Sequence, residues 1–81
     1  MGRFPSLSSA QIIRALRQAD FVDAPRRGKG SHRALCRRDK DGRVRLVIVP
    51  HGRDIPRGTV SAILDQAGIS REEFLRLLRR R

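Results

Sequence analysis

The sequence predicts a single α+β domain over residues 1–81, in which one helix is followed by three strands and two further helices. Three observations carry this prediction. Helix signals begin at Ser8, runs rich in β-branched residues flank Asp41-Gly42, and helix signals return after Pro56. A chain of this length buries only about 60% of the surface that it exposes when unfolded, so one modest core is expected.

The first helix is predicted from Ser8 and Gln11, which have the spacing of a capping box. Apolar residues then follow at helical spacing, at Ile12, Ile13, Leu16 and Ala19. We expect this helix to end near Asp20, with Phe21 and Val22 entering the core.

The middle of the chain has the pattern of an antiparallel sheet. Asp41-Gly42 separates two strand-like runs, Arg33–Arg38 and Arg43–Pro50. Asp-Gly favours a two-residue hairpin turn in which both residues have positive φ. Both faces of the second run are apolar, so alternation does not identify the face that packs on the core. A third short strand is expected over Val22–Arg26.

Two helices are predicted for the last third of the chain. Pro56 suits a first helical turn, and we expect Asp54 or Thr59 to cap it. Gly68 is placed to end this helix, and Ser70–Glu73 has the form of a second capping box. The expected core residues of the two helices are Val60, Ile63, Leu64, Ala67, Phe74, Leu77 and Leu78.

The charge balance points to a polyanionic partner. Lys and Arg number 19 against 8 Asp and Glu, which gives a net charge of +11, and only Lys29 and Lys40 are lysines. Arginine binds phosphate through a planar fork of donors. Nucleic acid is therefore the leading partner class, an acidic protein the second and a membrane surface the third, while biased base usage would explain the composition without any partner. With three Phe and no Tyr or Trp, the chain has little with which to stack bases.

Cysteine usage and hydropathy predict a cytoplasmic protein with no membrane association. Cys36 is the only cysteine, so it has no partner for an internal disulfide. No apolar run approaches the roughly 20 residues of a membrane span. The first residues also lack the apolar core of a secretory signal.

Several kinds of catalytic site are disfavoured by the residues present. The two histidines, His32 and His51, are far apart in the sequence, and the acidic residues do not cluster, so neither a metal site nor a cofactor is expected. Ser31 directly precedes His32, and neighbours on a strand point to opposite faces, which makes Ser31 a poor nucleophile for that base. No phosphate-cradling loop or Gly-x-Ser-x-Gly motif is present.

Metal-independent cleavage of RNA fits the remaining residues. The 2′-hydroxyl of the substrate supplies the nucleophile, so the protein needs only a proton carrier and cations for the phosphate. Gly28–His32 brings these groups together, since its glycines allow close approach of a phosphate, Lys29 supplies charge and His32 can carry a proton. The alternative is a histidine that only forms hydrogen bonds within a strand, beside a lysine in a solvated loop.

Other basic and polar residues near this segment are candidates for RNA binding. We expect Gly30 and Ser31 to contact phosphate together with Lys29. The arginines that flank the segment are further candidates, although each also fits a general surface charge: Arg26, Arg27, Arg33 and Arg37.

Five motifs in a fixed order support a family assignment. They are Gly28–His32, Asp41–Arg43, Val49–Gly52, Asp54–Val60 and Ile63–Phe74. Together they span roughly Ser9 to Leu78, and this combination resembles the HicA family of toxin–antitoxin systems. The resemblance implies a fold like the double-stranded RNA-binding domain, cleavage of messenger RNA, His32 as the catalytic residue, and a HicB-like antitoxin that covers the active site.

The chain departs from the family pattern at His51. Family members usually carry at least one residue between the Val-Pro that ends a strand and the following His, whereas here His51 follows Pro50 directly. The loop is therefore shorter. His51 is either a second proton carrier or phosphate ligand, or a loop histidine that helps the turn into the next helix.

Three functional hypotheses follow. The first is an endoribonuclease that acts through His32. The second is a binding module that grips RNA by its shape and phosphates without cutting it. The third is a small basic protein whose only role is to pair with an acidic partner.

Overall fold

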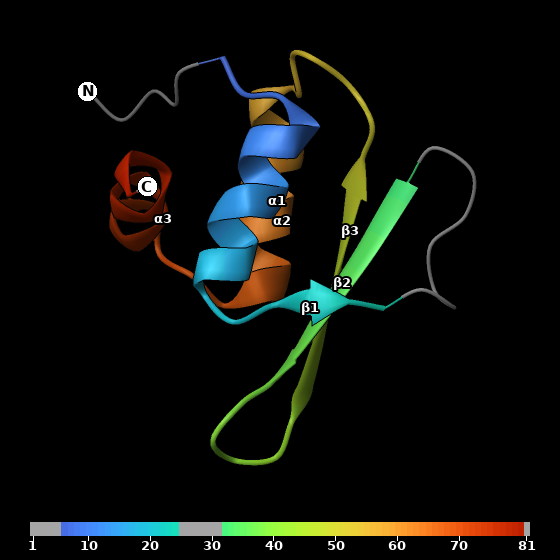
Figure 1. Cartoon of the computed structure of the whole chain (residues 1–81), viewed down its shortest axis with the longest axis vertical. Helices are drawn as coiled ribbons and strands as arrows, with labels where there is room; N and C mark the ends of the chain where they lie inside the picture. The colour runs from blue at the N-terminus through green and yellow to red at the C-terminus, as the bar shows by residue number, and fades with distance from the viewer. Residues whose placement is uncertain (1–5, 25–31, 81) are drawn as a thin grey trace.

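Three strands form an antiparallel sheet in the order β1-β2-β3, and the helices lie together on one side of it (Figure 1). The computed structural model describes residues 6–24 and 32–80. The elements follow the chain as α1 (Ser9–Gln18), β1 (Val22–Asp23), β2 (His32–Arg38), β3 (Val44–Pro50), α2 (Arg57–Ala67) and α3 (Arg71–Arg79). The predicted α+β class, with its α-β-β-β-α order and additional C-terminal helix, is confirmed.

Helix α1 begins as predicted and leads into β1 through a tight turn. The Ser8 hydroxyl accepts from the Gln11 backbone N–H, and the Gln11 side chain accepts from the Ser8 backbone N–H. After the helix, Asp20 has a φ of 72°. Phe21 enters the core and is 1% exposed.

The expectation for Val22 is wrong, because this side chain is 60% exposed. Val22 lies opposite Cys36 in the β1–β2 pairing, on the sheet face that points away from the helices. Successive strand residues point to opposite faces, so Phe21 and Val22 cannot both be buried against the helices. Strand β1 is also shorter than predicted. It ends at Asp23, and residues 25 and 26 of the expected strand lie outside the described residues.

The hairpin turn differs from the predicted two-residue form. Strands β2 and β3 are joined by residues 39–43, and the Asp39 backbone N–H donates to the Arg43 carbonyl at 2.8 Å. Gly42 has a φ of 86°, whereas Asp41 does not have positive φ. The Asp41 carboxylate accepts from the Arg43 backbone N–H at 3.0 Å, so this longer turn requires positive φ at Gly42 only.

The strand register decides which face of the hairpin is the core. Leu35 lies opposite Val47, and Leu35, Val47 and Val49 are fully buried toward the helices. Val44 and Leu46 alternate with them and are 54% and 37% exposed. The structure thus identifies the core face that the apolar pattern of β3 left undecided.

The beginning of α2 was predicted correctly in position but not in its cap. Pro56 is the N-cap residue, and no side chain caps the helix. Asp54 instead accepts a hydrogen bond from the hydroxyl of Ser6, in the segment that precedes α1, at 2.9 Å. Gly68, with a φ of 69°, ends the helix as predicted.

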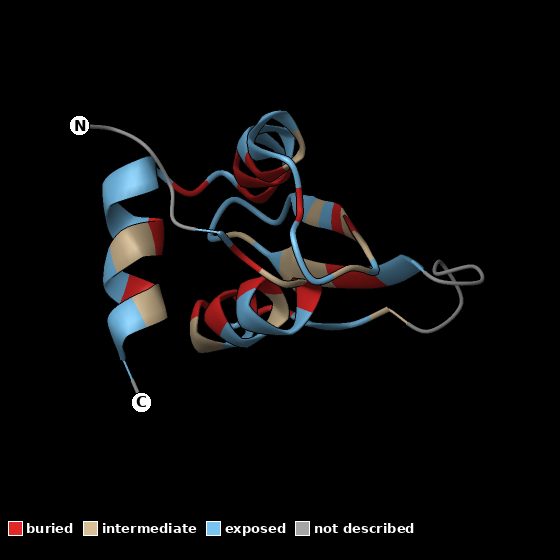
Figure 2. Cartoon of the chain, turned by 90° about the horizontal axis from the view of Figure 1, so that it is seen from above, coloured by how far each residue is buried: buried red, intermediate tan, exposed pale blue. Residues whose placement is uncertain are grey.

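The helices bury the residues expected of them. The predicted core residues of α2 are all buried. Helix α3 is capped by Ser70, packs against α1, and buries Phe74 and Leu77, while Leu78 is partly buried. Figure 2 shows the buried residues gathered where the helices face one another and the sheet.

A cluster of charged side chains fixes the turn end of the hairpin. The Asp39 carboxylate accepts from Arg45 Nε at 2.7 Å and from Arg37 Nη2 at 3.1 Å. Arg37 also donates to the Ala19 carbonyl at 3.0 Å and lies over the Phe21 ring at 4.7 Å. These contacts tie the hairpin to the end of α1.

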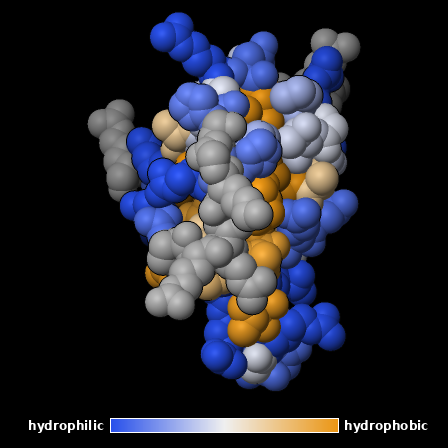
Figure 3. Space-filling model, turned by 90° about the vertical axis from the view of Figure 1, so that its right-hand side faces the viewer, coloured by the Kyte–Doolittle hydropathy of each residue, from blue (hydrophilic) through white to orange (hydrophobic). Residues whose placement is uncertain are grey.

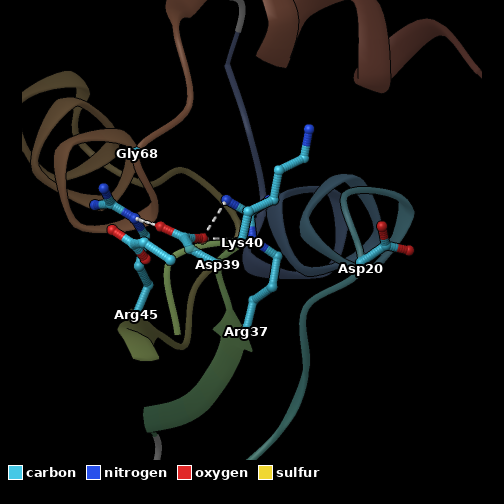
Figure 4. A pocket seen from close by; sticks show the side chains of 7 residues that line it. Asp20, Arg37, Asp39, Lys40, Arg45 and Gly68 are labelled. Carbon is cyan, nitrogen blue, oxygen red and sulfur yellow. Dashed lines mark hydrogen bonds and ion pairs between the residues drawn. The ribbon is translucent and has the colours of Figure 1, made fainter. Parts of the chain in front are cut away.

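This cluster lines a pocket (Figure 4). The residues that line it are Asp20, Arg37, Asp39, Lys40, Asp41, Arg45 and Gly68. A Cβ at Gly68 would lie 2.6 Å from the Arg45 guanidinium and would displace that group, while the φ of 69° is the backbone reason for glycine here. The central guanidinium groups already bind Asp39, which makes the pocket a structural feature.

Removal of the Asp39 charge is expected to destabilise the chain in a pH-dependent way. The hydrogen bond from Arg45 is the main reason that the pKa of Asp39 lies below its usual value of 3.8. The folded chain therefore holds this carboxyl ionised to lower pH than the unfolded chain does, and the stabilisation is lost as the pH falls through the folded-state pKa. We expect Asp39→Asn to lower the Tm clearly at pH 7, and the difference from the parent to shrink in acid.

Asp23→Asn provides the matched control for thermal unfolding. Asp23 also binds two arginines, but its side chain is 48% exposed against 19% for Asp39. Because exposed ion pairs contribute little, its replacement should change the Tm less. Equal Tm values for the two variants at pH 7 would contradict the role given to Asp39.

Candidate functional site

Both histidines lie at the same end of the β2–β3 hairpin. His32 begins β2 and is the register partner of Pro50, which ends β3, so His51 is the next residue after that pair. Both histidines are exposed. The opposite end of the hairpin is the turn at residues 39–43. We call the end that carries His32 and His51 the histidine end.

The position of His32 on β2 determines the direction of its side chain. His32 shares a sheet face with its partner Pro50 and with Ala34, and this is the face that points away from the helices. Leu35 alternates with them and is buried in the core. An imidazole at this position can therefore meet a bound molecule without any movement of the helices.

The loop after His51 is fastened to the start of α1. The Gly52 carbonyl accepts from the Ser9 backbone N–H at 2.9 Å and from the Ser9 hydroxyl at 3.2 Å. The Ile55 backbone N–H donates to the Leu7 carbonyl at 2.8 Å. His51 therefore begins a loop with two fixed points. The structure brings it to the same end as His32, which the sequence did not establish.

Arg33 lies next to His32 in the chain, but its side chain is engaged elsewhere. Its Nη2 donates to Asp23 at 2.9 Å, and Asp23 also accepts from Arg17 at 3.1 Å. The hydrogen bond from Arg33 is the main reason that the pKa of Asp23 is lowered. Arg33 alternates with His32 and therefore points to the other sheet face, where its side chain remains 51% exposed and keeps a free edge.

The other predicted binding residues fall into two groups. The expected role of Arg37 in RNA binding is not supported, because Arg37 lies at the turn end and binds Asp39 and the Ala19 carbonyl. Its position on the helix-facing side of β2 explains this. The remaining candidates lie outside the described residues: Arg26, Arg27, Gly28, Lys29, Gly30 and Ser31.

Two exposed arginines at the histidine end were not selected from the sequence. Arg53 lies in the loop after His51, and Arg57 is the first residue of α2. The sequence did contain a signal for them, since both arginines lie close to Pro56, where a helix start was predicted. The charges of Arg53 and Arg57 add to the partial positive charge at the start of α2.

The histidine end favours anions through its helices as well. The starts of α1 and α2 lie near the end of β3 (Figure 1), and neither helix has an acidic residue in its first turn. Free backbone N–H groups and the helix dipole make such ends partly positive. Asp54, an acidic residue of the connecting loop, accepts a hydrogen bond from Ser6.

Two negative findings concern the described residues. Over residues 6–24 and 32–80, no three His, Cys, Asp or Glu side chains come together in a way that would hold a metal ion. In the same part of the chain, no helix is long and apolar enough to cross a membrane.

The chain is a small, basic α+β domain with two exposed histidines at one end of its three-stranded sheet. The sequence matches the family model described as HicA toxin of bacterial toxin-antitoxin over residues 9–69. This match covers most of the chain, which therefore belongs to the HicA toxin family. The family assigns it the toxin role in a toxin–antitoxin system and implies an antitoxin partner. A comparison with curated protein sequences gives no significant match.

The accessibility of both imidazoles can be checked by chemical modification. Because His32 and His51 are exposed, diethylpyrocarbonate should modify both in the free chain at comparable rates. Mass spectrometry of the digested chain would locate the modifications. Selective protection of His32 in the free chain would contradict its placement at the surface.

Proposed function

We propose that this toxin is a metal-independent endoribonuclease that cleaves messenger RNA and uses His32 as its general acid or base. The observation that carries the proposal is the position of His32, exposed at the start of the central strand on the face free of helices. A histidine at this position is accessible to a substrate as large as RNA. The chain also belongs to a toxin family, which fits a cleavage reaction.

The proposed reaction uses the RNA as its own nucleophile. The ribose 2′-oxygen attacks the neighbouring phosphorus, the bond from phosphorus to the 5′-oxygen breaks, and a cyclic phosphate and a 5′-hydroxyl result. One proton leaves the 2′-hydroxyl and one reaches the departing 5′-oxygen. A histidine can carry either proton, since its pKa lies near neutrality in ordinary surroundings.

The phosphate is held by cations near His32. Lys29, Gly30, Ser31 and Arg27 are the proposed phosphate contacts from the sequence. Arg33 is a further one, and it would contact the RNA from the other sheet face. The exposed Arg53 and Arg57 and the starts of two helices support an anionic ligand at this end. Fixed positive charge would also stabilise the charge that accumulates on the phosphate during cleavage.

A HicB-like antitoxin is the proposed inhibitor, and it would act by covering His32. We infer that the toxin works in the cytoplasm, where messenger RNA is present, and that it needs no cofactor. His51 is either a second proton carrier or phosphate ligand, or a loop histidine that helps the turn into α2.

Replacement of His32 tests the catalytic assignment. We expect His32→Ala to lower the rate of RNA cleavage by about 10²- to 10⁴-fold, the range typical of a lost acid or base. The Kd for a non-cleavable 2′-deoxy or 2′-O-methyl analogue should stay close to that of the parent. Cleavage by the variant at the parental rate would refute the endoribonuclease proposal in this form. It would also leave the non-catalytic RNA-binding module as the better account.

The same assay on His51→Ala distinguishes the two interpretations of that residue. A loss comparable to that of His32→Ala would identify a second proton carrier. An unchanged rate would assign His51 to the loop. Circular dichroism of both variants should match the parent, because both side chains are exposed.

Cleavage is expected to persist without divalent metal ions. Since the proposed reaction needs only proton carriers and cationic side chains, excess EDTA should leave the initial rate unchanged in buffer freed of metals. Loss of activity in EDTA, with recovery on addition of Mg²⁺ or Zn²⁺, would contradict a metal-independent reaction.

A further inference from the structure

The sheet face that points away from the helices carries an unusual set of exposed apolar side chains. In the described part of the chain, the exposed large hydrophobic residues are Val22, Val44 and Leu46. Val22 of β1 and Leu46 of β3 both pair with Cys36 of β2, and Val44 of β3 pairs with Arg38 of β2. The register therefore places all three on this one face. Their grouping therefore follows from the strand pairing.

These residues belong to a continuous strip, which we call the open-face strip. Its exposed members are Val22, Val44 and Leu46, its partly exposed members are Cys36 and Ile48, and Ala34 belongs to the same face but is only 5% exposed. Figure 3 shows the side of the molecule on which the sheet lies, with a band of hydrophobic side chains between hydrophilic ones. Exposed apolar groups that cluster in this way mark interaction sites more often than scattered ones do.

The open-face strip is continuous with the candidate catalytic residue. The partly exposed Ile48 pairs with the buried Ala34, and the next pair toward the histidine end is His32 and Pro50, so the strip reaches His32 along β3. His32 lies four residues from Cys36, which is about 13 Å along a strand. A protein interface of ordinary size covers about 800 Å² on each partner and is roughly 30 Å across, so a partner centred on the strip also covers His32.

The surroundings of the strip favour an acidic partner. Arg38, Lys40 and Arg43 are exposed at the turn end and form no ion pair within the described residues. The Asp41 carboxylate nearby accepts from the backbone N–H of Arg43. The open-face strip is apolar and has a cationic end, and the whole chain carries a net charge of +11. A protein surface with apolar and acidic groups would complement it.

The other possible occupants fit less well. A second copy of the chain would bring two charges of +11 together. RNA would find few groups to bind on the strip itself, since the phenylalanines of the described part, Phe21 and Phe74, are fully buried and cannot stack on bases.

We propose that the open-face strip is the docking surface for the toxin's acidic antitoxin, which silences the toxin by extending from this strip over His32. The part concerning His32 rests on the proposed function. Docking on an apolar surface separate from the phosphate contacts lets the antitoxin bind tightly without imitating RNA.

The test uses a strip variant that carries Val22→Thr, Val44→Thr and Leu46→Thr. Threonine is β-branched and suits a strand, so the sheet is kept while the apolar surface is lost. Binding of the purified cognate antitoxin is measured by calorimetry, with His32→Ala present in all chains so that toxicity does not limit expression. We expect the strip variant to bind about 100-fold more weakly than its parent, because central apolar contacts dominate protein interfaces.

Leu75→Gln is the matched control. It replaces a partly exposed leucine on α3, which lies on the side of the molecule away from the sheet (Figure 1). Its antitoxin Kd should stay within about threefold of the parent, as is usual for surface substitutions. With His32 restored, the strip variant should cleave RNA within about threefold of the parental rate, which also shows that it folds.

Cys36 provides a second readout without any substitution in the strip. It is the only cysteine of the chain and lies within the strip, partly exposed. Alkylation by N-ethylmaleimide, followed at this residue by mass spectrometry, should slow in the antitoxin complex and should stay unchanged with a bound 2′-O-methyl RNA.

Several outcomes would overturn the proposal. Antitoxin binding to the strip variant as tight as to the parent, or unchanged alkylation of Cys36 in the complex, would show that the antitoxin docks elsewhere. Loss of RNA binding in the strip variant would assign the face to RNA. A parental dimer that becomes monomeric in the variant would assign it to a second copy. If the parent cleaves no RNA, the proposed function fails, and antitoxin affinity still decides the docking surface.

Discussion

The pairing of β2 with β3 is the constraint on which the rest of the molecule depends. Because side chains alternate across a strand, one register divides the hairpin into two surfaces. Leu35, Val47 and Val49 meet the helices and form the centre of the core. On the other surface, the same pairing aligns His32 with the open-face strip. A slip of one residue would exchange the two surfaces and remove both core and site.

The two ends of the hairpin are held by different interactions. Ion pairs fix the turn end, and backbone hydrogen bonds fasten the loop at the histidine end. At the turn end, Asp39 binds Arg37 and Arg45, and these three charges join the hairpin to the rest of the fold. At the histidine end, the loop after His51 is fastened through backbone groups to Ser9. The histidine imidazoles therefore remain exposed, and the cations there remain available for a ligand.

A toxin needs an exposed site and a means of silencing it, and we propose that both lie on one sheet face of this fold. The HicA family places the chain in a system with an antitoxin. An apolar strip next to His32 allows an inhibitor to obtain its affinity from hydrophobic burial, which does not depend on salt as phosphate contacts do. Substrate binding and inhibition can then be altered by different residues.

The sequence by itself determined the local features of the protein. The capping box of Ser8 and Gln11, the end of α2 at Gly68 and the apolar stripe of α2 each depend on neighbours within a few residues, so their spacing was sufficient to predict them. The motif order also indicated the family. Net charge depends on composition alone, and it predicted that the partner is nucleic acid or an acidic protein.

Only the tertiary structure decided how distant segments meet. It exposed Val22, gave the hairpin a longer turn, placed Arg37 at the turn end, and brought His51 to the end of the sheet where His32 lies. These outcomes depend on strand register and on helices packing from one side. Register is fixed by contacts between residues far apart in the chain, which no local pattern records.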